Sequence, residues 1–107
     1  MARMTDGKAL QIEITPQGSL RLSAEVAQRF FPADTLVVLT RGPELWLLPV
    51  RGPAAGGLLL KQRNPQGDRS VVLQGIVERD LPAGRHAAFW DGERGALRVT
   101  LMSVAET

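Results

Sequence analysis

The chain has 107 residues, of which 44% are hydrophobic and 22% charged, and its formal net charge is +2. No apolar run approaches the ~20 residues that a membrane-spanning helix needs, so we expect a soluble, cytoplasmic domain without a membrane partner. With no cysteine and one histidine, the chain lacks a disulfide framework and a thiolate metal site. We therefore predict neither a bound metal nor another cofactor.

The first predicted element is a β-hairpin over residues 9–22, after a polar tail at 1–8. Apolar and polar residues alternate over 10–14 and again over 20–22, which is the period of a strand with one buried face. The tripeptide Pro-Gln-Gly at 16–18 supplies the turn, because proline presets φ and glycine accepts a positive φ.

A short helix and a second hairpin follow. Ser23 is a plausible N-cap, and apolar residues then recur at helical spacing over about 24–31 until Pro32 ends the helix. Two apolar runs, at 35–40 and 45–50, predict two more strands joined by a tight turn.

The second half repeats this order. Pro-Gln-Gly recurs at 65–67, an offset of 49 residues from the first copy, and a Gly- and Pro-rich linker at 52–57 separates residues 9–51 from residues 58–102. We infer an internal duplication whose two copies close one pseudo-symmetric core, the alternative being a chance recurrence of turn residues. Residues 103–107 are predicted to be a second tail.

Further strands are predicted in the second copy at 58–63, 69–73, 85–90 and 96–102. Gly75 costs about 1 kcal/mol relative to alanine in a helix, so a strand or single turn is expected where the first copy has its helix. The elements together predict a mostly-β barrel or sandwich with one short helix. We expect Trp46, Phe89 and Trp90 to lie in its core, since a base-stacking role would require exposed rings.

The sequence offers little material for catalysis, and we expect no enzyme activity. There is no cysteine, no serine lies in a Gly-x-Ser-x-Gly motif, and the acidic residues are scattered. The lone histidine, His86, is more consistent with a surface or hydrogen-bonded structural residue than with a general base.

Four basic residues are placed near the two turns. Arg21 follows the first turn, and Lys61, Arg63 and Arg69 surround the second, so a hairpin there would bring cations to one surface. Such a cluster could bind the phosphates of DNA. The alternative is a solvated strand face on which Asp68 is the local partner.

The order of strand, Gly turn, strand and helix in Ile12-Glu13-Ile14-Thr15-Pro16-Gln17-Gly18-Ser19-Leu20-Arg21-Leu22-Ser23 resembles the swapped-hairpin module of AbrB, MazE and MraZ regulators. The resemblance covers residues 10 to 50 and reaches 58 to 102 through the repeat. It implies a small swapped-hairpin β-barrel, closed by two modules in a homodimer or by tandem copies in one chain. It also implies DNA binding in bacterial transcriptional or antitoxin control.

Two function hypotheses follow. The first is a bacterial DNA-binding regulator or antitoxin-like protein that uses Arg21, Lys61, Arg63 and Arg69. The second is a non-catalytic protein-interaction or assembly accessory domain that has lost DNA binding. It is motivated by Gly18-Ser19 and Gly67-Asp68, which stand where the family's turn commonly has Gly-Arg.

Overall fold

The structure is a computed structural model that describes residues 10–50 and 57–101. The tails predicted at 1–8 and 103–107, and the linker predicted at 52–57 except for Gly57, lie outside the described residues. The first half contains β1 (Leu10–Ile14), β2 (Ser19–Leu22), α2 (Ala24–Phe30), β3 (Thr35–Arg41) and β4 (Glu44–Pro49). The second half contains β5 (Leu58–Leu59), β6 (Lys61–Gln62), β7 (Arg69–Val72), β8 (Gly84–Asp91) and β9 (Ala96–Thr100).

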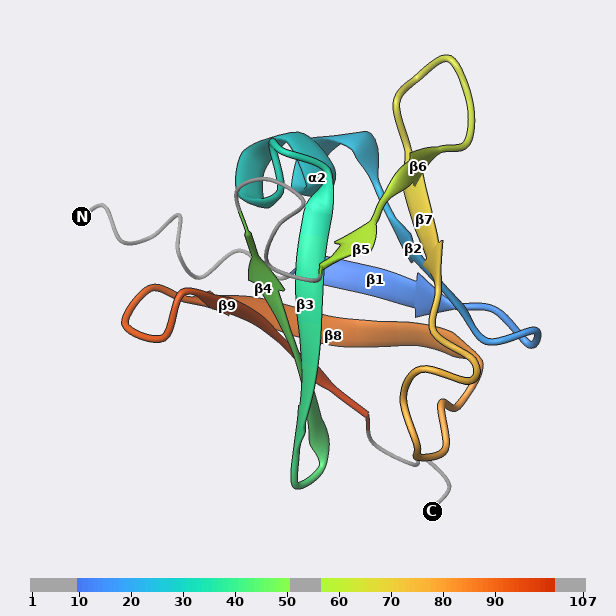
Figure 1. Cartoon of the computed structure of the whole chain (residues 1–107), viewed down its shortest axis with the longest axis vertical. Coiled ribbons are helices and arrows are strands. Elements are labelled where there is room, and N and C mark those ends of the chain that lie inside the picture. Colours follow the sequence, from blue (N-terminus) through green and yellow to red (C-terminus); the bar gives the residue numbers. More distant parts are fainter. Residues whose placement is uncertain (1–9, 51–56, 102–107) are drawn as a thin grey trace.

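All of these strands belong to one sheet, in the order β5-β3-β4-β9-β8-β1-β2-β7-β6. Only Leu60 separates β5 from β6, so the two ends of the sheet meet and the sheet curls into a nearly closed barrel (Figure 1). Hairpins from the two halves alternate around it: β3-β4, β9-β8, β1-β2 and β7-β6. Each half therefore completes the sheet of the other, which confirms the predicted swapped-hairpin barrel.

The two Pro-Gln-Gly turns are built by the same hydrogen bonds. The Gly18 amide donates to the Thr15 carbonyl at 2.9 Å, and the Gly67 amide donates to the Asn64 carbonyl at 3.0 Å. Each pair is related to the other by the same offset of 49 residues. This repetition of backbone contacts supports the duplication inferred from the tripeptide.

Two cross-strand pairs mark the pseudo-twofold axis of the barrel. Arg21 pairs with Ser70 between β2 and β7, and Trp46 pairs with Arg98 between β4 and β9. The members of each pair are themselves related by the repeat, at offsets of 49 (70 − 21) and 52 (98 − 46) residues. The axis therefore passes through the β2–β7 and β4–β9 pairings, which lie at opposite points of the ring.

The core fills the barrel and is covered at one end by α2. The Ser23 hydroxyl accepts from the Val26 amide at 3.2 Å, which confirms the predicted N-cap. Seven residues are too few for a helix that is stable alone, so α2 depends on packing Val26, Ala27 and the fully buried Phe31 onto the sheet. The core cluster comprises Ile12, Ile14, Leu20, Leu22, Val26, Ala27, Phe31, Leu36, Leu45, Leu47, Leu60, Val71, Leu73, Ala88, Leu97, Val99 and Leu101.

The second half has a single turn where the first has α2, as Gly75 predicts. The Ile76 and Val77 amides both donate to the Leu73 carbonyl, and no further helical turn follows them.

The predicted placement of the large aromatic residues in the core is wrong for two of the three. Trp90 packs against the core, but Phe89 is 46% exposed and Trp46 lies half-buried on the outer face of the sheet. The core positions beside them on their strands are taken by Ala88, Leu45 and Leu47. Because neighbouring strand residues point to opposite faces, the aromatic rings point outward.

Candidate nucleic-acid interface

A row of polar side chains, four of them charged, crosses the outer face of five strands. Successive cross-strand partners are Arg85 on β8, Glu13 on β1, Arg21 on β2, Ser70 on β7 and Lys61 on β6. These side chains point away from the core because their strand neighbours, such as the buried Ile12, Leu20 and Leu22, point into it. Strand pairing thus brings cations from both halves of the chain onto one surface.

We call the surface formed by Arg21, Lys61, Arg63 and Arg85 the basic face. Lys61, Arg63 and Arg85 are exposed, and none of them forms an ion pair within the described part of the chain. Arg21 lies 3.9 Å from a carboxylate oxygen of Glu13, with both side chains more than 40% exposed. An ion pair of that length in water is weak, so Arg21 remains able to turn toward another anion.

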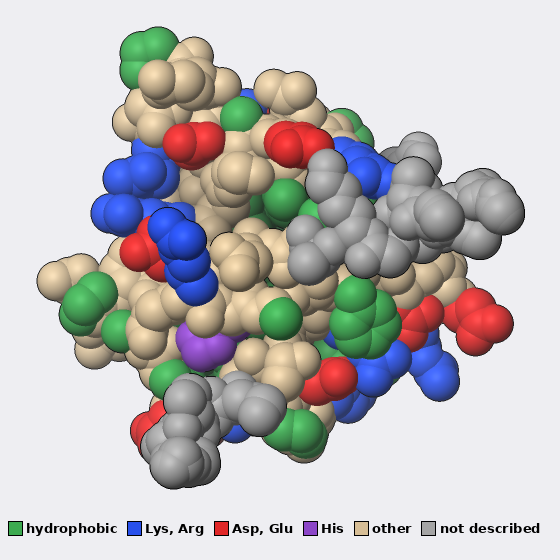
Figure 2. All heavy atoms as spheres, turned by 180° about the vertical axis from the view of Figure 1, so that it is seen from behind, with side chains coloured by type: hydrophobic (Ala, Val, Ile, Leu, Met, Phe, Trp, Pro, Cys, Tyr) green, Lys and Arg blue, Asp and Glu red, His purple; other side chains and the backbone are tan. Residues whose placement is uncertain are grey.

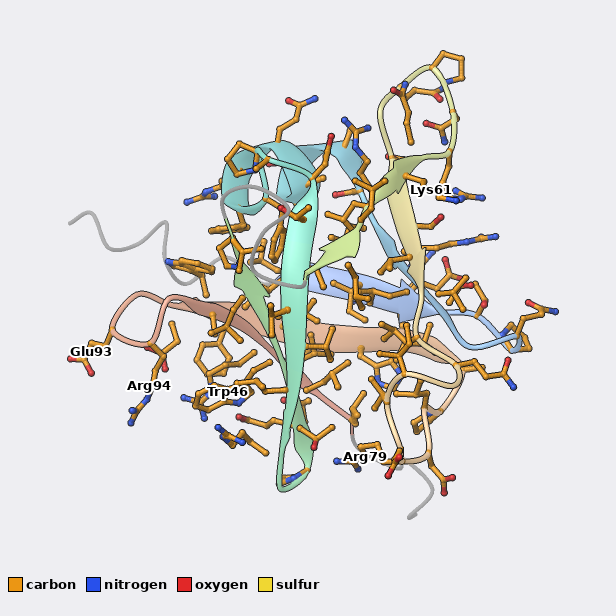
Figure 3. All side chains as sticks on the ribbon, in the orientation of Figure 1. Trp46, Lys61, Arg79, Glu93 and Arg94 are labelled. Atoms are coloured by element: carbon orange, nitrogen blue, oxygen red, sulfur yellow. The ribbon has the colours of Figure 1, made fainter. Side chains whose placement is uncertain are left out.

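The basic face is hollowed between β1, β2 and the loop after β6. A shallow depression of about 240 Å³ is lined by Gln11, Ile12, Glu13, Arg21, Leu22, Ser23, Arg63, Asp68 and Arg85. Figure 2 shows Lys and Arg side chains gathered around acidic ones on the side of the molecule where β2 and β7 lie. In Figure 3 the side chain of Lys61 extends outward from β6. An anionic chain on this surface would meet four cations and the carboxylates of Glu13 and Asp68.

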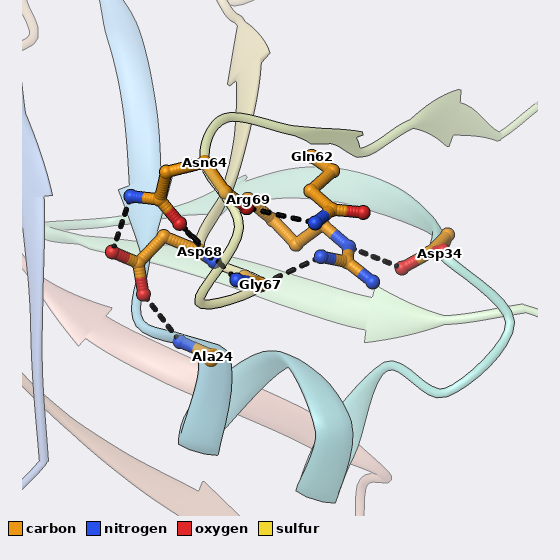
Figure 4. A network of polar contacts seen from close by, with 7 residues as sticks. All are labelled: Ala24, Asp34, Gln62, Asn64, Gly67, Asp68 and Arg69. Carbon is orange, nitrogen blue, oxygen red and sulfur yellow. Dashed lines mark hydrogen bonds and ion pairs between the residues drawn. The ribbon is translucent and has the colours of Figure 1, made fainter.

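Arg69, the fourth basic residue that the sequence suggested, lies apart from this face. It is the cross-strand partner of the buried Leu22, and its side chain is only 17% exposed. Its Nε donates to Asp34 Oδ1 at 2.9 Å and its Nη1 to the Gly67 carbonyl at 2.6 Å (Figure 4). These contacts tie the second turn to the segment after α2, so we leave Arg69 out of the candidate interface.

Asp68 has a structural role beside the basic face. Its Oδ1 accepts from the Ala24 amide at 2.8 Å, at the start of α2, and its Oδ2 accepts from the Asn64 side-chain amide at 2.9 Å (Figure 4). The hydrogen bond from Asn64, followed by that from Ala24, holds the pKa of Asp68 below its ordinary value. Asp68 is therefore a helix cap supplied by the other half of the chain, in addition to being a neighbour of Arg63.

His86 has a structural role, as a buried side chain that forms a hydrogen bond to the backbone. It is buried on β8, and its Nε2 lies 2.6 Å from the Pro82 carbonyl oxygen. Since a carbonyl can only accept, Nε2 carries the proton and donates it to this bond. Among the described residues, no group of three or more His, Cys, Asp or Glu side chains could hold a metal ion, and no helix is long and apolar enough to cross a membrane.

Sequence reasoning missed Arg85 as a member of the basic face. Alternation along β8 could have indicated that Arg85 points outward, opposite to His86. The alternation could not indicate that β8 lies beside β1, because that pairing joins residues more than seventy positions apart.

No family model, curated protein or solved structure matches this chain. The candidate site therefore rests on its own geometry.

Proposed function

We propose that this chain is a small bacterial, cytoplasmic DNA-binding regulator or antitoxin-like protein of the swapped-hairpin type. The observation that carries the proposal is the basic face. There Arg63 and Arg85, which form no ion pair among the described residues, and the weakly paired Arg21 line one depression, and the exposed Lys61 lies on the same face. Cations grouped in this way bind phosphates, and binding gains free energy from the counterions that each neutralised phosphate releases. The depression would seat the backbone of the nucleic acid.

Duplex DNA suits this face better than a single strand. Proteins that hold single strands commonly add aromatic rings on which bases stack, and none of the described residues that line the depression is aromatic. Contacts from arginine and lysine to phosphate set position and affinity but carry little sequence information. We therefore expect modest sequence preference from this face alone.

The test is binding of a fluorescent duplex from upstream of the chain's own gene, followed by anisotropy at low salt. Replacing Lys61 and Arg63 with alanine removes two cations from the face and should weaken binding about tenfold or more. Arg41→Ala with Arg94→Ala removes the same charge from the opposite side of the barrel and serves as the matched control. Equal affinities for the two double variants, or no binding by the wild type, would count against the proposal.

The alternative is an accessory domain that kept the fold and binds protein instead. It is favoured by Asp68, which caps α2 at a position where an arginine would follow the turn glycine in the regulators, and by the engagement of Arg69 in the same network. A stable protein partner recovered together with a failure to bind DNA would support it.

A further inference from the structure

A second surface lies on the far side of the barrel from the basic face. Leu39 on β3, Trp46 on β4, Arg98 on β9 and Phe89 on β8 are successive cross-strand partners. They point outward because Leu45, Leu47, Leu97 and Val99 on the same strands fill the core. We call these four side chains the aromatic platform. It lies over the β4–β9 pairing, opposite the β2–β7 pairing that carries Arg21.

Arg98 holds the platform together. Its guanidinium carbon lies 4.9 Å from the ring centroids of both Trp46 and Phe89. The same guanidinium bonds Glu44 at 2.8 Å and Asp91 at 2.9 Å, and the bond from Arg98 lowers the pKa of Asp91. Its charge is therefore neutralised, while its position between the two rings is fixed.

The Trp46 ring is fixed at a further point. Its Nε1 donates to Glu44 Oε1 at 2.8 Å, so the indole has its polar atom satisfied and its ring is held in place. Rings that are fixed before a partner arrives lose little entropy on binding.

Two further arginines border the platform. Arg41 and Arg94 lie 5.6 and 5.9 Å from the Trp46 ring centroid, and both are exposed. Within the part of the chain that the structure describes, neither forms an ion pair. Figure 3 shows Arg94 on the Trp46 side of the β8–β9 turn and Glu93 pointing away from it. The platform thus combines an apolar centre, including the half-exposed Phe89, with cations at its rim.

We propose that the aromatic platform is a docking surface for an acidic segment of a partner protein. A large apolar side chain of that segment would pack on Phe89 and Leu39 beside Trp46, and carboxylates on either side of it would pair with Arg41 and Arg94. The charge complementarity comes from these two cations, since Arg98 already bonds two acids. This proposal is independent of DNA binding by the basic face and would give the accessory-domain alternative its surface.

The geometry favours a protein segment over a nucleic acid at this place. Glu44 and Asp91 flank Arg98 and would repel a chain that carries a phosphate at every residue more than a segment whose carboxylates lie only at its ends, beside Arg41 and Arg94. Guanidinium groups also occupy the ring faces on which bases would stack. Addition of a strand is disfavoured at the middle of the platform, because β4 and β9, which carry Trp46 and Arg98, are paired on both sides.

The test uses Trp46 as a reporter in the full chain. Trp90 stacks on Phe30 away from the platform, so Trp90→Phe leaves Trp46 as the single tryptophan. The probe is a capped hexapeptide with leucine and phenylalanine at its centre and two glutamates at each end. We expect a saturable change in Trp46 fluorescence, and affinity about tenfold lower when Arg41 and Arg94 are both replaced with alanine.

Three controls make the test decisive. A peptide with glutamine in place of glutamate should bind about tenfold more weakly, Phe89→Ala should weaken binding similarly, and Lys61→Ala with Arg63→Ala should leave it unchanged. Saturation by single-stranded oligothymidylate but not by the peptide would show a nucleic-acid platform instead. That result, an unchanged fluorescence signal, or equal affinity for the glutamine peptide would overturn the proposal.

Discussion

Gly18 and Gly75 share one backbone conformation in different surroundings. Both have a φ of +86°, but a Cβ on Gly18 would lie 2.7 Å from the Cβ of Gln74, whereas a Cβ on Gly75 would meet nothing within 4 Å. Gly18 lets the first turn dock against the second half, where its carbonyl accepts from the Leu73 and Gln74 amides. Glycine is thus required at position 18 for packing as well as for its positive φ.

Alanine at these two positions separates backbone strain from crowding. Gly75→Ala should cost about 1 kcal/mol of unfolding free energy, because it adds only the left-handed strain. Gly18→Ala should cost about 3 kcal/mol, because the clash with Gln74 is added to that strain. Urea unfolding of the two variants measures the difference. Equal losses would show that the first turn does not pack as described.

Asp68 links stability to pH. Its pKa is lowered in the folded state, so its contribution is complete above the unfolded pKa of about 3.9 and is lost as the pH falls through the lower folded value. The wild type should therefore lose stability in acid more steeply than Asp68→Asn, which cannot titrate at this position. Thermal unfolding from pH 6 down to about pH 2.5 compares the two. Parallel pH profiles would contradict this role of the carboxylate.

The aromatic residues show where sequence reasoning fails for a single side chain. In the segment that contains Leu45, Trp46, Leu47 and Leu48, every position is apolar, so alternation cannot assign a face. A tryptophan is then expected inside on hydrophobicity alone. Trp46 points outward because its neighbours Leu45 and Leu47 occupy the core. Arginines from β3, β9 and the β8–β9 turn contact its ring on the outer face.

The hairpins and the helix were predictable because their signals are local. Alternation in the first hairpin and apolar runs further along indicated most strands to within a few residues, and Ser23 and Pro32 bounded the helix. The break at Leu60 was not predictable from the apolar run around it. There the amide of Leu60 leaves the strand pairing and donates to the Asp34 carbonyl at 2.8 Å, which divides the predicted strand into β5 and β6.

This divided strand is expected to be the weakest part of the barrel. β5 and β6 pair over two positions each, whereas their counterpart β1 pairs with β8 over five. The amides of Leu59 and Lys61 should therefore exchange with solvent on the order of 100-fold faster than those of Ile12 and Ala88. Amide exchange followed by NMR measures this ratio. Uniform protection would indicate that the ring is closed as firmly here as elsewhere.

The two halves of the molecule share one order of hairpins but differ in what they contribute. The first half contributes the helix. The second half contributes the turn that caps it and three of the four cations of the basic face, Lys61, Arg63 and Arg85. Neither half has a complete sheet, since every hairpin pairs with hairpins of the other half. These contacts between distant segments determine which charged residues share a surface, and a single sequence gives little information about them.

The proposed function requires that the cations of the basic face contact phosphates. The number of these contacts can be estimated from the salt dependence of the binding constant. Four phosphate contacts should give a slope of about −3.6 in a plot of log binding constant against log salt concentration. Lys61→Ala with Arg63→Ala should reduce it to about −1.8, while Arg41→Ala with Arg94→Ala should leave it unchanged. Duplex binding without salt dependence, or an unaltered slope after the loss of Lys61 and Arg63, would contradict DNA binding by the basic face.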